Sequence, residues 1–240
     1  MKRSHVRPRL AALLTAIVVS VGLLGLSTAP AWAAGTVTVF PVSSPPYYIT
    51  SGPDGNLWFT QGETGQIGRI TTSGTITDFS TPTAKSGPVG ITAGPDGNLW
   101  FTEQNVGKIG RITTSGSITE FPVPHSSLGI TAGPDGNLWF TMFYNNMIGR
   151  ITPAGVVTSF AFPKCGSYAI CGPLGITTGP NGNLWFTLHD AAAVEQITTS
   201  GSFVSGFRTG SGPEGITVGP DGNLWFTDLG ARGIGRFVAS

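Results

Sequence analysis

Residues 52–60 read GPDGNLWFT, and this stretch decides the fold because it occurs five times along the chain. Three further copies begin at Gly94, Gly133 and Gly219, and another begins at Gly179 with Asn in place of Asp. The tryptophans of successive copies are 39 to 46 residues apart. The chain is therefore an array of five similar units.

Each unit predicts four short strands. Asp54-Gly55 is typical of a hairpin turn, because glycine adopts positive φ without a Cβ clash. The run from Leu57 to Phe59 is apolar on both faces of a strand, which predicts a sheet covered on both sides. Four strands in about 40 to 45 residues are typical of a propeller blade. We therefore predict an all-β fold, a five-bladed β-propeller of four-stranded antiparallel blades.

The N-terminal strand is expected to close the ring. The fifth unit ends at IGRFVAS and lacks the segment that follows IGRI in the first three units. The stretch GTVTVFPV at 35–42 aligns with GSITEFPV at 116–123, which places Phe40 on Phe121. A strand added to the last blade would remove an open sheet edge. We therefore expect a closed ring and a monomer.

Residues 1–33 have the pattern of a secretory signal peptide. Four basic residues precede an apolar run at 10–26, and Ala31-Trp32-Ala33 follows as a cleavage site. An uncleaved membrane anchor is the alternative interpretation. We expect a secreted protein with one propeller domain at 34–240. Without the leader nine basic and 12 acidic residues remain, which disfavours nucleic-acid binding.

The two cysteines, Cys165 and Cys171, lie in the longest interval between units. In an oxidising compartment, two cysteines in one short insertion are expected to form a disulfide. Two free thiols are the alternative.

The connections between strands should fall on two faces of the disc, because strand direction alternates within a blade. Residues shared by every unit, such as the repeated Trp and Arg, are interpreted as scaffold. On one face the units differ, and a variable ring on a rigid frame is where a site is expected. The variable positions before Gly-Ile-Thr, or its equivalent, are Tyr47, Val89, Leu128, Leu174 and Glu214. Those after Trp-Phe-Thr are Gln61, Glu103, Met142, Leu188 and Asp228.

The phrases IGRITTSG, ITEFPVP and SGPVGIT, together with the repeated GPDGNLWFT, resemble the virginiamycin B lyase (streptogramin lyase) family over residues 36–237. The resemblance implies a carbon–oxygen lyase that linearises cyclic depsipeptide (streptogramin B) antibiotics by elimination, assisted by magnesium. In such chemistry a histidine removes a proton next to a carbonyl while a cation polarises the ester. The alternative is a non-catalytic secreted propeller that binds a glycan or peptide on its variable face.

The family has seven blades, and it places a tyrosine, and in other blades histidines, between Pro and Gly-Ile-Thr. Tyr47 matches the tyrosine, although Tyr48 follows it where the family has glycine. No unit of this chain has a histidine at that position. The chain therefore departs from the family pattern at its site.

The candidate site residues come from the variable face. His189 and His125 lie after the predicted signal peptide. They are the candidate catalytic bases, because imidazole exchanges protons near neutral pH. The expected substrate-binding residues are Tyr47, Glu214 and Gln61. Glu103 and Asp228 are the expected ligands of the cation.

Overall fold

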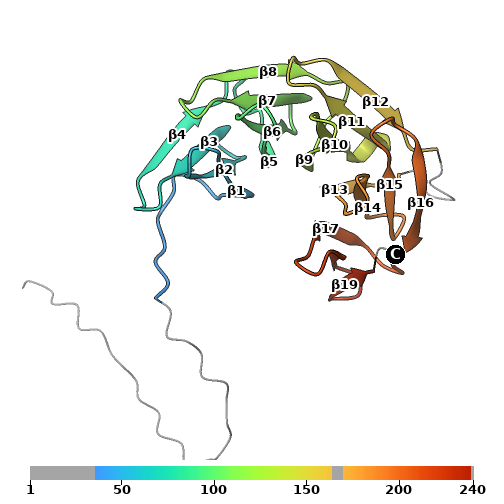
Figure 1. Ribbon diagram of the computed structural model, residues 1–240. Coiled ribbons are helices and arrows are strands. Elements are labelled where there is room, and N and C mark those ends of the chain that lie inside the picture. Colours follow the sequence, from blue (N-terminus) through green and yellow to red (C-terminus); the bar gives the residue numbers. More distant parts are fainter. Residues whose placement is uncertain (1–35, 164–169, 239–240) are drawn as a thin grey trace, which may run out of the picture. The chain divides into compact units, whose positions relative to one another are not determined.

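The computed structural model describes residues 36–163 and 170–238 (Figure 1). The chain divides into two compact units, Met1–Val39 and Phe40–Ser240, and the described strands all lie in the second. The predicted signal peptide lies outside the described residues. In the described ranges, no helix has the length and apolar character needed to span a bilayer.

The described strands form five antiparallel sheets, each built from strands that are consecutive in sequence (Figure 1). The first sheet contains β1 (Ile49–Ser51), β2 (Leu57–Gln61), β3 (Gln66–Ile70) and β4 (Ile76–Ser80). The second contains β5 (Pro88–Ala93), β6 (Leu99–Glu103), β7 (Lys108–Ile112) and β8 (Ile118–Pro122). The third contains β9 (Ile130–Ala132), β10 (Leu138–Met142), β11 (Met147–Ile151) and β12 (Val157–Ala161).

The fourth sheet contains β13 (Pro173–Thr178), β14 (Leu184–Leu188), β15 (Ala193–Ile197) and β16 (Phe203–Arg208). The fifth contains β17 (Pro213–Val218), β18 (Leu224–Asp228) and β19 (Gly233–Phe237). One 3₁₀ turn, η1 (Phe143–Asn145), is the only helical element among the described residues. The first strands of successive sheets contact one another in chain order, from β1 to β17. The all-β prediction is confirmed.

The repeated GPDGNLWFT stretch forms the hairpin at the start of each second strand. In the first sheet Gly55 has a φ of 75°, and the Trp58 indole Nε1 donates a hydrogen bond to Asp54 Oδ1 at 3.0 Å. A Cβ on Gly52 would collide with the same indole ring, so glycine is required there. The five units share this bond, with Asn181 accepting it in the fourth. The motif therefore fixes a turn and its tryptophan together.

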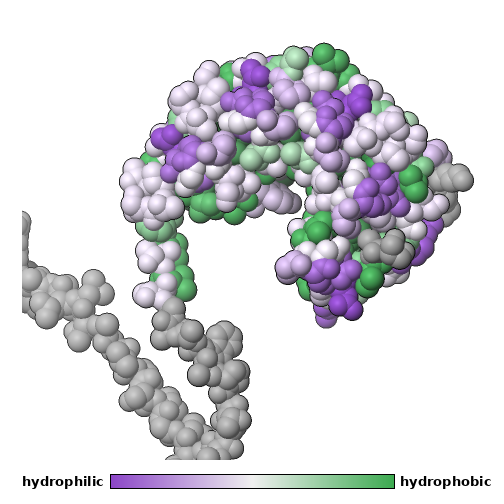
Figure 2. All heavy atoms as spheres, in the orientation of Figure 1, coloured by the Kyte–Doolittle hydropathy of each residue, from purple (hydrophilic) through white to green (hydrophobic). Residues whose placement is uncertain are grey.

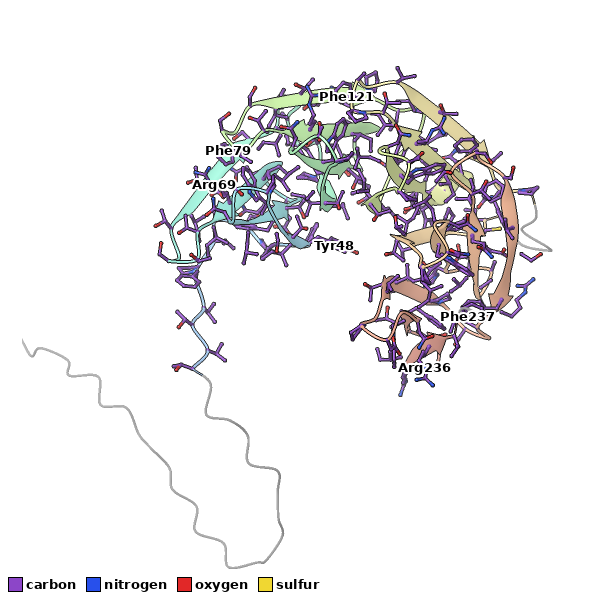
Figure 3. The ribbon with its side chains drawn as sticks, viewed as in Figure 1. Tyr48, Arg69, Phe79, Phe121, Arg236 and Phe237 are labelled. Atoms are coloured by element: carbon purple, nitrogen blue, oxygen red, sulfur yellow. The ribbon has the colours of Figure 1, made fainter. Side chains whose placement is uncertain are left out.

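Contacts between neighbouring sheets also repeat. The Arg69 guanidinium lies 5.6 Å from the ring centroids of Trp58 and Phe79, in a cation–π arrangement (Figure 3). Its Nη1 donates a hydrogen bond to the Thr114 carbonyl of the second sheet at 3.0 Å. Arg111 and Arg150 make the same contacts in the next two sheets. These arginines are scaffold, as the sequence predicts.

The fifth sheet differs from the others because it has three strands among the described residues. In the described part of the chain β19 pairs only with β18, and residues 36–42 lie in no strand. Closure of a five-bladed ring by the N-terminal strand stays a prediction.

Candidate functional site

His189 lies directly after β14, where its backbone N–H donates to the Gly172 carbonyl at 2.9 Å. Its Nδ1 lies 3.0 Å from Asp190 Oδ1, and its Nε2 lies 3.8 Å from Glu214 Oε1. The imidazole is about one-third exposed. A histidine held between two carboxylates and still open to solvent is suited to exchange a proton with a ligand.

A cavity of about 420 Å³ lies next to this histidine, lined by residues in or beside the first strand of every sheet and by Thr227 of β18. Its side chains are mostly apolar, and Glu214 is the single charged residue lining it. Tyr48 lines the cavity from the first sheet and is labelled on the inner side of that sheet in Figure 3. His189 contacts Glu214 but does not itself line the cavity. Glu214 therefore links the histidine to the cavity.

The two tyrosines are placed differently. Tyr47 is half-exposed, its backbone N–H donates to the Thr60 carbonyl at 3.0 Å, and its ring packs against Gly62. Tyr48, which takes the place of the family glycine, is the one that lines the cavity. Tyr48 and Asp190 are the site residues that the sequence analysis missed. Their positions beside Tyr47 and His189 were the available signal.

Gln61 and Asp228 are buried, and both accept hydrogen bonds from residues of neighbouring loops. Gln61 Oε1 accepts hydrogen bonds from the Ser43 hydroxyl and the Ser44 N–H, and its Nε2 donates to Asp78. Asp228 Oδ1 accepts a hydrogen bond from the Ser211 hydroxyl at 2.5 Å and one from the Ala231 N–H at 3.0 Å.

Glu103 is fully buried at the end of β6, and neither of its carboxylate oxygens has a hydrogen-bond partner among the described residues. Burial, together with the negative charge of Glu120, raises the pKa of Glu103 to about 7 against the opposing influence of Ser86 and Lys108. Lys108 is already paired with Glu120 at 2.6 Å. Glu103 is therefore a carboxyl group that changes its charge near pH 7 instead of being fully ionised there.

The expected magnesium ligands, Glu103 and Asp228, do not fit a common cation site. They contact different neighbours, and both are buried. Within the described ranges no three His, Cys, Asp or Glu side chains gather in a way that would hold a metal ion. Magnesium needs accessible oxygens and usually keeps several waters.

The other predicted residues lie apart from His189. His125 is half-buried in the loop between β8 and β9, and its side chain makes no hydrogen bond or ion pair within the described residues. Cys171 is fully buried, and its N–H donates to Asn146 Oδ1 at 2.6 Å. Cys165 lies outside the described residues, so the Cys165–Cys171 disulfide stays a prediction.

Three of the solved structures similar to this chain are streptogramin lyases. A catalytically inactive variant of virginiamycin B lyase from Staphylococcus aureus, with quinupristin, is 39% identical with a TM-score of 0.80, covering 86% of this chain and 72% of its own. The selenomethionine form of that enzyme is 41% identical with a TM-score of 0.80, covering 85% and 71%. A streptogramin B lyase is 38% identical with a TM-score of 0.77, covering 84% and 68%.

A putative gluconolactonase is 15% identical with a TM-score of 0.62, which shows the shared fold alone. The search of curated proteins found no match. The family model described as the virginiamycin B lyase family matches residues 28–203 and again 124–240. The chain belongs to the virginiamycin B lyase family.

Proposed function

We propose that this protein is a secreted carbon–oxygen lyase that opens a cyclic depsipeptide of the streptogramin B class at its ester bond. The observation that carries the proposal is His189, held between Asp190 and Glu214 beside a cavity in a member of this family. The solved relative that contains quinupristin supports this substrate class.

His189 is the proposed base. Its Nδ1 faces Asp190, which fixes the tautomer that leaves Nε2 free to accept a proton. Nε2 takes the proton from the carbon next to a substrate carbonyl, a carbon–carbon double bond forms, and the neighbouring carbon–oxygen bond of the ester breaks. The leaving group departs as a carboxylate. Glu214, 3.8 Å from Nε2, stabilises the imidazolium that forms.

The cavity is the proposed binding site for the peptide ring. Its isoleucine and leucine lining suits an apolar cyclic ligand, and Tyr48 supplies an aromatic surface with a polar hydroxyl. Glu214, the one charge in the lining, fixes the orientation of the substrate toward His189.

The last sheet is proposed to gain its fourth strand from residues 35–42, as a complete ring of blades requires. Phe40 already packs on Gly74, as Phe79 packs on Gly116. In the second case the phenylalanine comes from the outer strand of the preceding sheet. Phe40 therefore occupies the place of an outer-strand phenylalanine.

The test is incubation of the purified protein with quinupristin, followed by mass spectrometry. Elimination leaves the mass of the ring unchanged and creates a new double bond, whereas hydrolysis adds the mass of water. Fragmentation and ultraviolet absorbance separate the linear product from the intact ring. His189→Ala should remove most turnover, His125→Ala should have a smaller effect, and full turnover by His189→Ala would refute the assignment.

A non-catalytic binding function is the second candidate. It is favoured by the absence of the family's histidines, whose positions hold Val89, Leu128, Leu174 and Glu214, and by the apolar lining of the cavity. Saturable binding of quinupristin without any conversion would support this candidate.

A further inference from the structure

The turn after β10 carries two aromatic side chains, Phe143 and Tyr144, on the same face as His189. Both residues belong to η1, and Tyr144 is 59% exposed. Phe143 stands at the position that His189 occupies in its own sheet. The pairs at the equivalent positions of the other four sheets are Gly62-Glu63, Gln104-Asn105, His189-Asp190 and Leu229-Gly230. Among the five sheets, the third is therefore the one with an aromatic pair at this turn.

The two rings extend the row of side chains around His189. The ring centroids of Phe143 and Tyr144 are 5.1 Å apart at an interplanar angle of 68°, and those of Phe143 and His189 are 6.4 Å apart at 46°. These separations are typical of interacting aromatic rings. From the next sheet along the chain, Glu214 of the cavity lining lies 3.8 Å from His189 Nε2. His189 therefore links the aromatic pair to the cavity.

Two glycines allow these side chains to come close to the backbone. A Cβ on Gly172 would lie 2.8 Å from the Phe143 ring and 3.0 Å from Asp190 Oδ2. A Cβ on Gly212 would lie 3.0 Å from His189 Nε2. These distances are shorter than ordinary van der Waals contact between heavy atoms. Phe143 and Asp190, which holds His189, therefore lie against the same stretch of backbone at Gly172.

The turn that carries the pair is held by hydrogen bonds to two other segments. Asn146, which ends η1, has a φ of 53°, a left-handed conformation that asparagine adopts more readily than most residues. The Asn146 carbonyl accepts a hydrogen bond from the Phe162 N–H at 2.8 Å, and its Oδ1 accepts one from the Cys171 N–H at 2.6 Å. Side chains on an anchored turn lose less conformational freedom when a ligand binds, which favours affinity.

The aromatic pair differs from ordinary exposed apolar residues. Hydrophobic residues are scattered between polar ones over the surface seen in Figure 2, and single apolar residues on a surface are normal. Phe143 and Tyr144, in contrast, adjoin each other and the candidate base. Such a group of rings beside a cavity indicates a binding surface.

We infer that Phe143 and Tyr144 bind an aromatic side chain of the ligand and select ligands that carry one. The two rings meet at 68°, so a third ring can stack on the face of one and present its edge to the other. Offset stacking and edge-to-face contact are the favoured arrangements of aromatic pairs. The inference rests on the proposed function for the class of ligand, a cyclic depsipeptide whose peptide ring lies in the cavity. Its aromatic side chain extends past His189 to the pair.

A sugar could also stack on aromatic rings, but the surroundings of the pair suit it less well. Sugar hydroxyls need side chains around them that donate and accept hydrogen bonds. Beside the pair, Asp190 already bonds to His189, and Asn146 already accepts the Cys171 N–H. An aromatic ring without polar substituents needs no such partners, so it is the better occupant of this surface.

The first experiment measures binding to the full chain by isothermal titration calorimetry. The ligands are cyclic hexapeptides closed by an amide, which elimination at an ester cannot consume. One peptide is wholly aliphatic, and each of the others has phenylalanine in place of leucine at one position. The best phenylalanine peptide should bind about 3- to 10-fold more tightly than the aliphatic one. Equal affinity for all the peptides, or no binding of any, would overturn the inference.

The second experiment assigns this preference to the two rings. Tyr144→Leu and Phe143→Leu keep an apolar side chain but remove the ring, so each should reduce the preference for phenylalanine to less than about twofold. Tyr144→Phe should retain the preference. The matched control is Val156→Ala, at an exposed residue of the same sheet in the turn between β11 and β12, which should also retain it. Circular dichroism checks that each variant is folded, and Tyr144→Leu changes only an exposed residue.

An unchanged preference in both leucine variants would overturn the inference. Binding of a methyl glycoside that Tyr144→Leu weakens would show a sugar-binding surface and would overturn it as well. Neither readout needs turnover, so the two proposals can fail separately. A phenylalanine preference without conversion of quinupristin would refute the lyase activity alone, whereas conversion without that preference would refute the inference alone.

Discussion

Replacing Glu103 by glutamine should stabilise the protein in alkaline solution. The first sheet shows how glutamine fits, because Gln61 at the equivalent position is buried and donates to Asp78 Oδ1 at 2.7 Å. Glu120 stands at the position of Asp78 in the second sheet. The amide of Glu103→Gln would therefore donate to Glu120 and give a partner to a group that now has none.

The magnitude follows from the pKa of Glu103, which burial and Glu120 raise from its ordinary 4.5 to about 7. Because the folded state holds the proton more tightly, the contribution of Glu103 to the free energy of unfolding is fully present below pH 4.5. It is lost as the pH rises through 7. The full loss is up to about 3 kcal/mol for this shift. Glutamine does not ionise, so the loss should be absent from the variant.

The assay is urea denaturation of Glu103→Gln and the unmodified chain at about pH 5 and about pH 8. Most of the loss in the free energy of unfolding falls between these two pH values. The variant should gain about 1 to 3 kcal/mol at the higher pH and much less at the lower pH. The matched control is Glu63→Gln, at an exposed residue of the first sheet, which should change little at either pH. An equal gain at both pH values, or no gain at the higher one, would refute the reasoning.

Three further predictions concern the site and the two chain segments outside the repeated sheets. If the protein is a lyase, His189→Ala should lower turnover of quinupristin roughly 100 to 10,000-fold, with a smaller effect from His125→Ala; steady-state kinetics and circular dichroism check both. Deleting residues 36–42 should lower the melting temperature or cause aggregation, because these residues are proposed to cover the open edge of the last sheet, and an unchanged melting curve would contradict this. Non-reducing peptide mapping should recover Cys165 linked to Cys171, and reduction should lower stability by about 2 to 3 kcal/mol at most without unfolding the sheets.

Most of the fold could be predicted from the sequence because its stabilising contacts are local and repeat five times. The turn at Asp54-Gly55 and the hydrogen bond from the Trp58 indole to Asp54 depend on residues four or fewer positions apart. The pattern can therefore be recognised in the amino-acid sequence. The role of the repeated arginines followed from their recurrence alone.

The site was predicted less completely. The sequence identified His189 and Glu214 as variable-face residues, and the structure brings them to 3.8 Å. It did not show that Glu103 and Asp228 point into the protein, because position after a strand does not determine burial. Tyr48 was noted as a departure from the family glycine, but its contact with the cavity depends on sheets far away in the chain.

The hydrogen bonds between sheets end on backbone carbonyls, and this choice of acceptor gives the variable ring its freedom to change. Thr60, Thr102 and Thr141 donate to the main chain of Val89, Leu128 and Leu174, whatever side chain those residues carry. A substitution at such a position alters what a ligand meets and leaves the sheet-to-sheet bond intact. Substitutions at these positions can therefore change which ligand binds at little cost to folding. Related chains can then differ in specificity while their β-sheets remain superimposable.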